Sequence, residues 1–200
     1  MEDILADFAG VIRRRLENRS YTTEDSVRYS FFVALLAHSS LEPHEVVLEY
    51  PHPQIAGAKI DTFLPSFDGR PTAIEFKYDR EIPSGAAVPR PQNAGELFSD
   101  ISRLARFVAT PEPRRLLVYC TDSIMVKYLQ NPANGHASFF NLGKNQRMTV
   151  DSSYLSSKPA TFLKALGSQL SVELECRWSE ALPNEHHLRV YGVGNSRGAV

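Results

Sequence analysis

Cysteine is scarce in this chain, with only Cys120 and Cys176 among 200 residues. Two cysteines exclude a disulfide-dense scaffold and a zinc site built from four cysteines. Long apolar runs are also missing, because no stretch approaches the ~18 consecutive apolar residues that a membrane span needs. The acidic start, MED, is unlike the basic start of a secretory signal. We therefore expect a soluble cytoplasmic protein without a membrane partner.

The chain has no excess of charge of either sign, since 22 Lys and Arg residues are matched by 23 Asp and Glu residues for a net charge of −1. This balance excludes a polybasic, histone-like binder of nucleic acid. Hydrophobic residues make up 42% of the chain, which supplies enough apolar surface for a core. A length of 200 residues fits one domain, at roughly 150 residues per domain.

Hydrophobic periodicity predicts an α-α-β-β-β-α-β-α order in the first two thirds of the chain. The expected helices span residues 3–17, a segment after Thr22, a segment from about 92, and 123–129, and the expected strands span 45–50, 59–64, 72–78 and 115–121. We expect Thr22 to cap the second helix, with Asp25 three residues later. The last of these strands, RLLVYCT, is nearly all apolar, which is typical of a strand buried on both faces.

The pattern weakens toward the C-terminus. Residues 130–157 carry Asn-Pro and Asn-Gly turn signals without a clear period, so we expect mostly irregular structure there. Pro159 and Gly167 frame a last short helix. Residues 171–178 and 187–193 predict a β-hairpin.

Two acidic residues and a lysine come together on the second and third expected strands. The two-residue period of a strand places Glu75 and Lys77 on one face of Glu75-Phe76-Lys77. Asp68-Gly69 predicts a hairpin turn between the two strands, so antiparallel pairing brings Asp61 beside Glu75. Oxygens of Asp61 and Glu75, with the Phe76 carbonyl, suit a hard divalent cation such as Mg²⁺, with Mn²⁺ as a substitute.

A cation held in this way lowers the pKa of a bound water and screens phosphate oxygens, while Lys77 orients that water and stabilises the developing negative charge. The pattern therefore suits phosphodiester hydrolysis. A Glu-x-Lys triplet alone says little, since about 0.4 such triplets are expected by chance in a chain of this composition. The alternative is a solvent-exposed hairpin face with an i,i+2 ion pair.

In this order the residues resemble the PD-(D/E)xK nuclease superfamily, whose restriction-endonuclease-like core runs α-β-β-β-α-β. Asp61 matches the Asp of the motif and Glu75-Phe76-Lys77 matches (D/E)xK, whereas Ile60 stands where the motif has proline. The resemblance covers about residues 22–130. Residues 131–200 lie outside it.

The resemblance implies an α/β fold with a restriction-endonuclease-like αβββαβ core, in which helices flank a mixed central sheet. We expect a single domain over residues 1–200, with the core at about 22–130. Residues 131–200 then form a family-specific C-terminal elaboration, a helix and a β-hairpin.

For activity, the resemblance implies a Mg²⁺-dependent endonuclease acting on DNA, in defence, restriction or repair. Asp61 and Glu75 would bind the metal, and Lys77 would orient and activate the attacking water. Many members carry a further acidic residue on the helix before the first strand, and here Glu24 is the candidate metal ligand. The alternative is that Glu24 is simply a first-turn acid that faces the helix dipole.

Four residues near the motif are candidates for holding the substrate. Arg80 and Arg90 belong to a Pro- and Gly-rich segment, 79–91, that we expect to be a mobile loop at the mouth of the site. Gln92 and Arg103 lie on the polar side of the following helix. A solvated helix face is the alternative for Gln92, Glu96, Asp100 and Arg103.

Two other functions remain open. A catalytically inactive module of this fold would bind nucleic acid or a partner protein through the arginines of residues 13–19 or 103–115. A toxin or effector component whose partner supplies recognition is a further alternative, because the chain is short and has no separate recognition domain. The partner that supplies recognition would be a second copy of the chain or another protein. Intact Asp61, Glu75 and Lys77 favour the enzyme.

Overall fold

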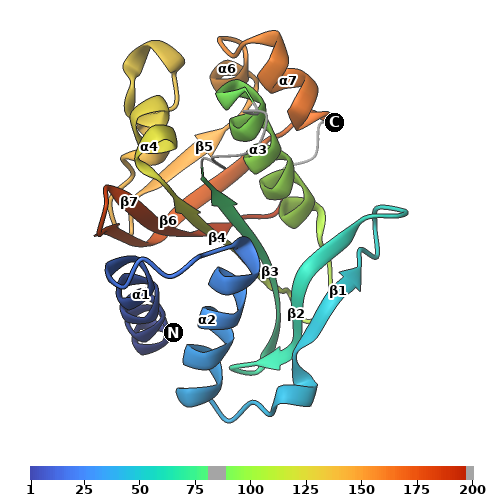
Figure 1. Cartoon of the computed structure of the whole chain (residues 1–200). Coiled ribbons are helices and arrows are strands. Elements are labelled where there is room, and N and C mark those ends of the chain that lie inside the picture. Colours follow the sequence, from blue (N-terminus) through green and yellow to red (C-terminus); the bar gives the residue numbers. More distant parts are fainter. Residues whose placement is uncertain (81–88, 197–200) are drawn as a thin grey trace.

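A computed structural model of the chain describes residues 1–80 and 89–196, which form an α/β structure (Figure 1). The helices are α1 (Glu2–Glu17), α2 (Glu24–Ala37), α3 (Arg90–Arg106), α4 (Ser123–Gln130), α5 (Ala137–Phe140), α6 (Ser152–Leu155) and α7 (Ala160–Leu166), with 3-10 turns at Pro43–Glu45 and Pro132–Asn134. The strands are β1 (Val47–Pro51), β2 (Lys59–Phe67), β3 (Arg70–Asp79), β4 (Arg114–Thr121), β5 (Arg147–Val150), β6 (Val172–Leu182) and β7 (His186–Val193).

Within the described residues the strands form one mixed sheet in the order β1-β2-β3-β4-β7-β6-β5. Among the strands that the structure describes, only β3 and β4 pair in parallel, and the other neighbouring strands pair antiparallel. A parallel pair needs a long crossover, and α3 lies in that connection. The expected order through α4 is confirmed, while β5, β6 and β7 continue the same sheet through the pairing of β7 with β4.

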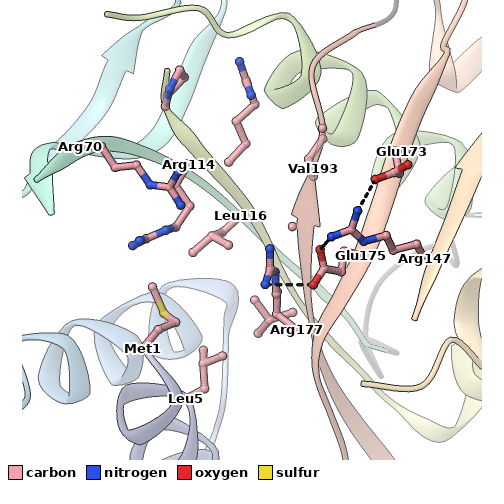
Figure 2. Close-up of a pocket in the computed structure, with 15 residues that line it drawn as sticks. Met1, Leu5, Arg70, Arg114, Leu116, Arg147, Glu173, Glu175, Arg177 and Val193 are labelled. Carbon is pink, nitrogen blue, oxygen red and sulfur yellow. Dashed lines mark hydrogen bonds and ion pairs between the residues drawn. The ribbon is translucent and has the colours of Figure 1, made fainter. Parts of the chain in front are cut away.

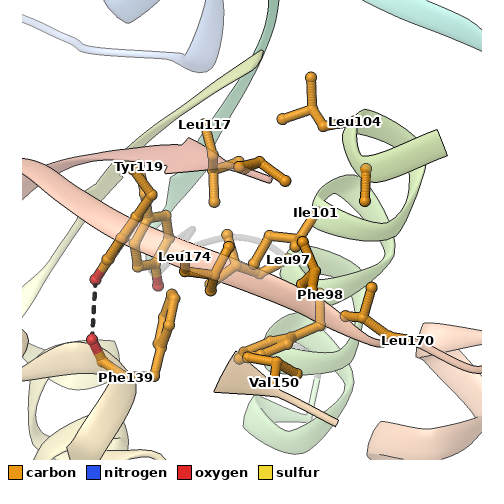
Figure 3. Packing of buried hydrophobic residues seen from close by; sticks show 14 of the residues in the cluster. Leu97, Phe98, Ile101, Leu104, Leu117, Tyr119, Phe139, Val150, Leu170 and Leu174 are labelled. Carbon is orange, nitrogen blue, oxygen red and sulfur yellow. Dashed lines mark hydrogen bonds between the residues drawn. The ribbon is translucent and has the colours of Figure 1, made fainter. Parts of the chain in front are cut away.

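Helices cover both faces of the sheet, and each face has its own apolar cluster. Ile74 and Phe76 of β3 pack toward α1 and α2, where the rings of Phe31 and Phe76 lie 5.5 Å apart. Phe98 of α3 packs over the other face, in a cluster that includes Tyr119 of β4 (Figure 3). Alternating residues of β3 therefore face opposite layers, as the two-residue period predicts. Among the described helices, none is both long and apolar enough to cross a membrane.

The start of α2 differs from the prediction by one residue. The cap is Thr23, whose side chain accepts a hydrogen bond from the backbone N–H of Ser26, while the Ser26 side chain accepts one from the backbone N–H of Thr23. The Thr22 hydroxyl instead donates to the Ser20 carbonyl at 2.9 Å. The prediction of Thr22 as the cap is therefore wrong, because its side chain is used by the preceding turn.

Residues 130–157 are more regular than their sequence predicts. They contain α5, α6 and β5, and β5 pairs antiparallel with β6 at the edge of the sheet. Only Val150 of the four residues of β5 is buried. These four residues alternate between polar and apolar, but an alternation of only four residues among turn signals is too short to predict a strand, which explains why the expectation of irregular structure is wrong here.

Helices α3 and α7 approach most closely at Gly95. A Cβ atom on Gly95 would lie 2.4 Å from the Phe162 carbonyl oxygen and 2.7 Å from the Cβ of Ala165. Because the obstacle is backbone, a side chain cannot be accommodated by a rotamer change. Gly95 therefore sets the distance between α3, which carries part of the candidate site, and α7.

Two glycine-to-alanine variants should change stability in opposite directions. Gly95→Ala should destabilise the protein by about 1–3 kcal/mol, because α7 must move away from α3. Gly10→Ala lies inside α1, where the new Cβ would have its nearest contact, the Arg14 side chain, at 3.6 Å. It should stabilise by up to about 1 kcal/mol through helix propensity. Urea denaturation of both variants measures these changes, and equal stability of the two would contradict the packing described here.

Candidate active site

The turn between β2 and β3 sets the register of the candidate site. Asp68 and Gly69 both adopt left-handed backbone conformations, with φ of 51° and 76°, which is typical of a two-residue hairpin turn. Pairing is antiparallel and places Thr62 opposite Ile74. Asp61 and Glu75 are the next residues outward on each strand, and the charge of Asp61 acts to raise the pKa of Glu75.

Beyond this point β2 and β3 separate. Pairing between them ends at Thr62 and Ile74, whereas β3 stays paired with β4 as far as Asp79. Two backbone N–H groups on the open edge of β3 donate to carboxylates instead of to a strand. The N–H of Phe76 donates to Oδ2 of Asp61 at 2.8 Å, and the N–H of Tyr78 donates to Oε2 of Glu24 at 2.9 Å.

Glu24 reaches this edge from the first turn of α2. Burial raises the pKa of its carboxyl group, and the hydrogen bond from Tyr78 opposes that rise. Asp61 also acts to raise the pKa of Glu24 by charge repulsion. Glu24 therefore lies at the same strand edge as Asp61. An acid that only faced the helix dipole would not accept a hydrogen bond from a strand, as Glu24 does from Tyr78.

Glu75 lies on the α3 side of the sheet and is almost fully buried, with 1% of its surface exposed. Burial raises the pKa of Glu75 well above its usual range, although a hydrogen bond from Arg103 opposes the rise. Nε of Arg103 donates to Oε1 of Glu75 at 2.6 Å, and Nη2 donates to Oδ1 of Asp100, also at 2.6 Å. Arg103 therefore joins a strand carboxylate to a helix carboxylate.

Lys77 faces the same helix two residues further along β3. Its Nζ lies 3.4 Å from Oε2 of Glu96, and the side chain of Gln92 donates to Oε1 of Glu96 at 3.0 Å. Burial by itself lowers the pKa of Lys77, but Asp100, Asp79 and other nearby carboxylates outweigh it and raise the pKa. Lys77 is therefore an ammonium ion at neutral pH, suited to orienting water and stabilising negative charge but not to accepting a proton.

Arg28 balances the charge of Asp61 from the other layer. Its Nη2 lies 3.3 Å from Oδ1 of Asp61, and its Nη1 lies 3.4 Å from Oε1 of Glu49 on β1. The guanidinium also sits 6.0 Å from the centre of the Phe76 ring. Asp61 is thus held between a backbone donor and a fixed cation.

Two further buried acids surround the site. Burial raises the pKa of Asp79 to about 6, although the Tyr119 hydroxyl donates to its Oδ2 at 2.8 Å. Burial also raises the pKa of Asp100 to about 7, against the opposing charge of Arg103. The site concentrates more carboxyl groups than the cations beside them balance, so part of the negative charge is removed by protonation near neutral pH.

The predicted substrate-binding residues differ in their surroundings. Arg80 stacks on the exposed ring of Tyr21, with its guanidinium carbon 4.4 Å from the ring centre, and Arg90 is exposed at the start of α3. Gln92 and Arg103 both contact carboxylates of the site. Most of the predicted mobile loop, residues 81–88, lies outside the described residues.

Sequence reasoning missed Arg28 and misjudged Asp100. A solvated helix face was the alternative weighed for Asp100, but this residue is largely buried and bonded to Arg103. Helical spacing offered a signal in both cases, since Arg28 follows Glu24 by four residues and Arg103 follows Asp100 by three. Neither spacing shows that the helix face in question lies against the sheet.

The donor atoms at this edge match the chemistry of a magnesium site. Asp61, Glu75 and the Phe76 carbonyl offer only oxygen, and both backbone groups of Phe76 point to the side of β3 that Asp61 occupies. In the described residues, no three His, Cys, Asp or Glu side chains are gathered as a metal-binding group. Arg28 and Arg103 supply the positive charge here, so a cation would replace them as the partner of the two carboxylates.

Comparison of the chain with protein-family models, with curated proteins and with solved structures found no match. The residues and geometry of this site are therefore the basis for assigning a function.

The buried carboxyl group of Asp100 should make stability depend on pH. Its pKa is higher in the folded protein, about 7, than the usual 3.8, so the stabilisation that it contributes is complete below about pH 4 and is lost as the pH rises through 7. Asp100→Asn removes the cost of ionising a carboxyl group in a buried position and keeps a hydrogen-bond acceptor for Arg103. The variant should therefore gain in melting temperature over wild type between about pH 5 and pH 8.

The exposed Asp25→Asn is the matched control and should show no such gain over the same range. Melting curves of wild type and both variants in one buffer series measure the effect. A difference between Asp100→Asn and wild type that is constant with pH, or that grows toward acid, would contradict the burial of Asp100.

Proposed function

We propose that this chain is a metal-dependent endonuclease that hydrolyses phosphodiester bonds in DNA. One observation carries the proposal: where β2 and β3 separate, Asp61 and Glu24 accept hydrogen bonds from the same edge of β3, the strand that carries Glu75 and Lys77. These are the residue types of the (D/E)xK pattern, on an antiparallel hairpin followed by a helix and a parallel strand. That arrangement supports a restriction-endonuclease-like fold as part of the proposal.

Asp61, Glu75 and the Phe76 carbonyl would hold Mg²⁺, or Mn²⁺ in its place, with Glu24 as a further acidic group. When bound, the cation would lower the pKa of a water and neutralise charge on the phosphate. Lys77 stays protonated beside the carboxylates, so it can orient a water and offset the negative charge that develops on the phosphate.

In the proposed reaction, the hydrogen bond between Arg103 and Glu75 must break before Glu75 can bind a metal ion. The hydrogen bond from Arg103 favours the ionised form of Glu75, because it lowers the pKa that burial raises. A divalent cation competes with Arg103 for the same carboxylate. Once released, Arg103 carries a guanidinium suited to a phosphate oxygen.

The mouth of the site supports nucleic acid as the substrate. Tyr21 is 73% exposed and carries Arg80 over its ring, an aromatic and cationic pair that can contact a base and a phosphate. The net charge of −1 gives little general attraction for DNA. We therefore propose that a second copy of the chain or a partner protein contributes to DNA recognition.

Cleavage assays with the purified protein test the function. Supercoiled DNA, linear DNA, single-stranded DNA and RNA are incubated with Mg²⁺ or Mn²⁺, with EDTA as the control. Cleavage of DNA should require metal, and Asp61→Asn, Glu75→Gln and Lys77→Met should each reduce the rate by about 100-fold or more. Glu49→Gln removes a nearby carboxylate outside the proposed set and should cleave like wild type.

Thermal unfolding separates metal binding from chemistry. Millimolar Mg²⁺ or Mn²⁺ should raise the melting temperature of wild type, because a ligand bound only by the folded state stabilises it. The shift should persist in Lys77→Met and disappear in Asp61→Asn and Glu75→Gln. Binding of DNA with neither cleavage nor a metal-dependent shift would reject the nuclease and favour a catalytically inactive binding module.

A further inference from the structure

A second concave site lies far from the candidate active site. It is a pocket of about 350 Å³ where the starts of β3 and β4 meet the end of β7 and the first turn of α1 (Figure 2). Arg70, at the start of β3, lines the pocket and lies seven residues before Lys77. At ~3.3 Å per residue the two ends of the strand are ~23 Å apart. The pocket is therefore separate from the carboxylate cluster.

Positive charge dominates the wall of this pocket. The lining includes five arginines, Arg70, Arg114, Arg115, Arg147 and Arg177, and two acidic residues, Glu173 and Glu175. On one side of the pocket the acidic residues form ion pairs with arginines. Glu175 lies 2.9 Å from both Arg147 and Arg177 (Figure 2). Arg115 is buried and bonded to the Phe107 carbonyl at 2.9 Å. Arg70 and Arg114 remain on the opposite side.

These two arginines are poorly neutralised. Arg70 is exposed and has no ion-pair partner among the residues that the structure describes. Nη1 of Arg114 is buried without a hydrogen bond, and the carboxylate of Asp68 that pairs with it is 3.5 Å away. Burial and then the charge of Arg70 lower the pKa of Arg114. Two cations that repel each other at the wall of a pocket are stabilised by an anion placed between them.

The geometry of Arg114 is fixed before any ligand arrives. Its guanidinium carbon lies 5.2 Å from the centre of the Phe67 ring, which limits the directions in which it can point. Met1, which is partly exposed, lines the pocket together with the largely buried Leu5 and Leu116, so part of the wall is apolar. The site therefore offers two chemistries together, a guanidinium pair for an anion and an apolar surface for an organic group.

We propose that this pocket binds a nucleotide-sized phosphate monoester, with the phosphate between Arg70 and Arg114 and the organic part against the apolar wall at Met1 and Leu5. Arginine donors match phosphate oxygens geometrically, and a volume of about 350 Å³ suits a small ligand better than a duplex. The phosphate monoester can belong to a free nucleotide or to the 5′ end of a strand. The proposal does not depend on cleavage at the carboxylate site.

Calorimetric titration in EDTA tests the pocket without a metal at the other site. The ligands are deoxyadenosine monophosphate, inorganic phosphate, and one oligonucleotide with and without a 5′-phosphate. Deoxyadenosine monophosphate should bind to wild type, and Arg70→Gln/Arg114→Gln should weaken that binding at least tenfold. Arg70→Gln alone, at an exposed residue without an ion pair, should weaken it measurably with no loss of melting temperature.

Two variants serve as controls and should bind deoxyadenosine monophosphate as tightly as wild type. Arg14→Gln removes an exposed arginine of α1 that lies nine residues beyond Leu5, and Glu75→Gln alters the carboxylate site. Tighter binding of the 5′-phosphorylated oligonucleotide than of its unphosphorylated form, lost in the double variant, supports the strand end as the source. Equal affinity for inorganic phosphate and the nucleotide would overturn the role of the apolar wall. Nucleotide binding that is absent, or unchanged in the double variant, would overturn the site.

Discussion

The separation of β2 from β3 after Ile74 is the constraint on which the candidate active site depends. A backbone N–H that loses its strand partner inside a protein must find another acceptor, because an unpaired buried donor is costly. Phe76 and Tyr78 find theirs in Asp61 and Glu24. The same requirement that satisfies the backbone therefore brings acidic groups from β2 and α2 to one strand edge, and the position of Glu24 requires α2 to pack against β3.

Gathering acids in a partly dry site has an electrostatic cost, and the protein offsets it in two ways. Arg28 of α2 and Arg103 of α3 lie on opposite faces of the sheet. Arg28 forms an ion pair with Asp61, and Arg103 forms one with Glu75. Burial raises the pKa of Asp100 to about 7, so a proton neutralises part of the remaining charge. Both effects are reversible, since a divalent cation can replace either the proton or the guanidinium group at a carboxylate. A site with this charge balance resists full ionisation until a positive ligand arrives.

Much of the central part of this structure follows from local sequence signals. The Asp68-Gly69 turn and the alternation in residues 72–78 predict the hairpin, its register and the shared face of Glu75 and Lys77. The pairing of Glu75 with Arg103 was not predictable, because it depends on how α3 crosses the sheet. That crossing is set in part by Gly95 against α7, a contact between segments far apart in the sequence. The alternation of polar and apolar residues in β5 spans only four residues, which is too short to predict a strand.

The position of β7 in the sheet has a consequence for how the protein is made. β4 is buried along nearly all of its length, with β3 on one side and β7 on the other, and β7 begins only at residue His186. While the chain leaves the ribosome, β4 therefore carries an unsatisfied edge until most of the remaining sequence has been synthesised. Such an edge can recruit strands from other molecules. A fragment that ends between α4 and β7 keeps the residues of the carboxylate site, yet leaves open the edge of β4 that pairs with β7.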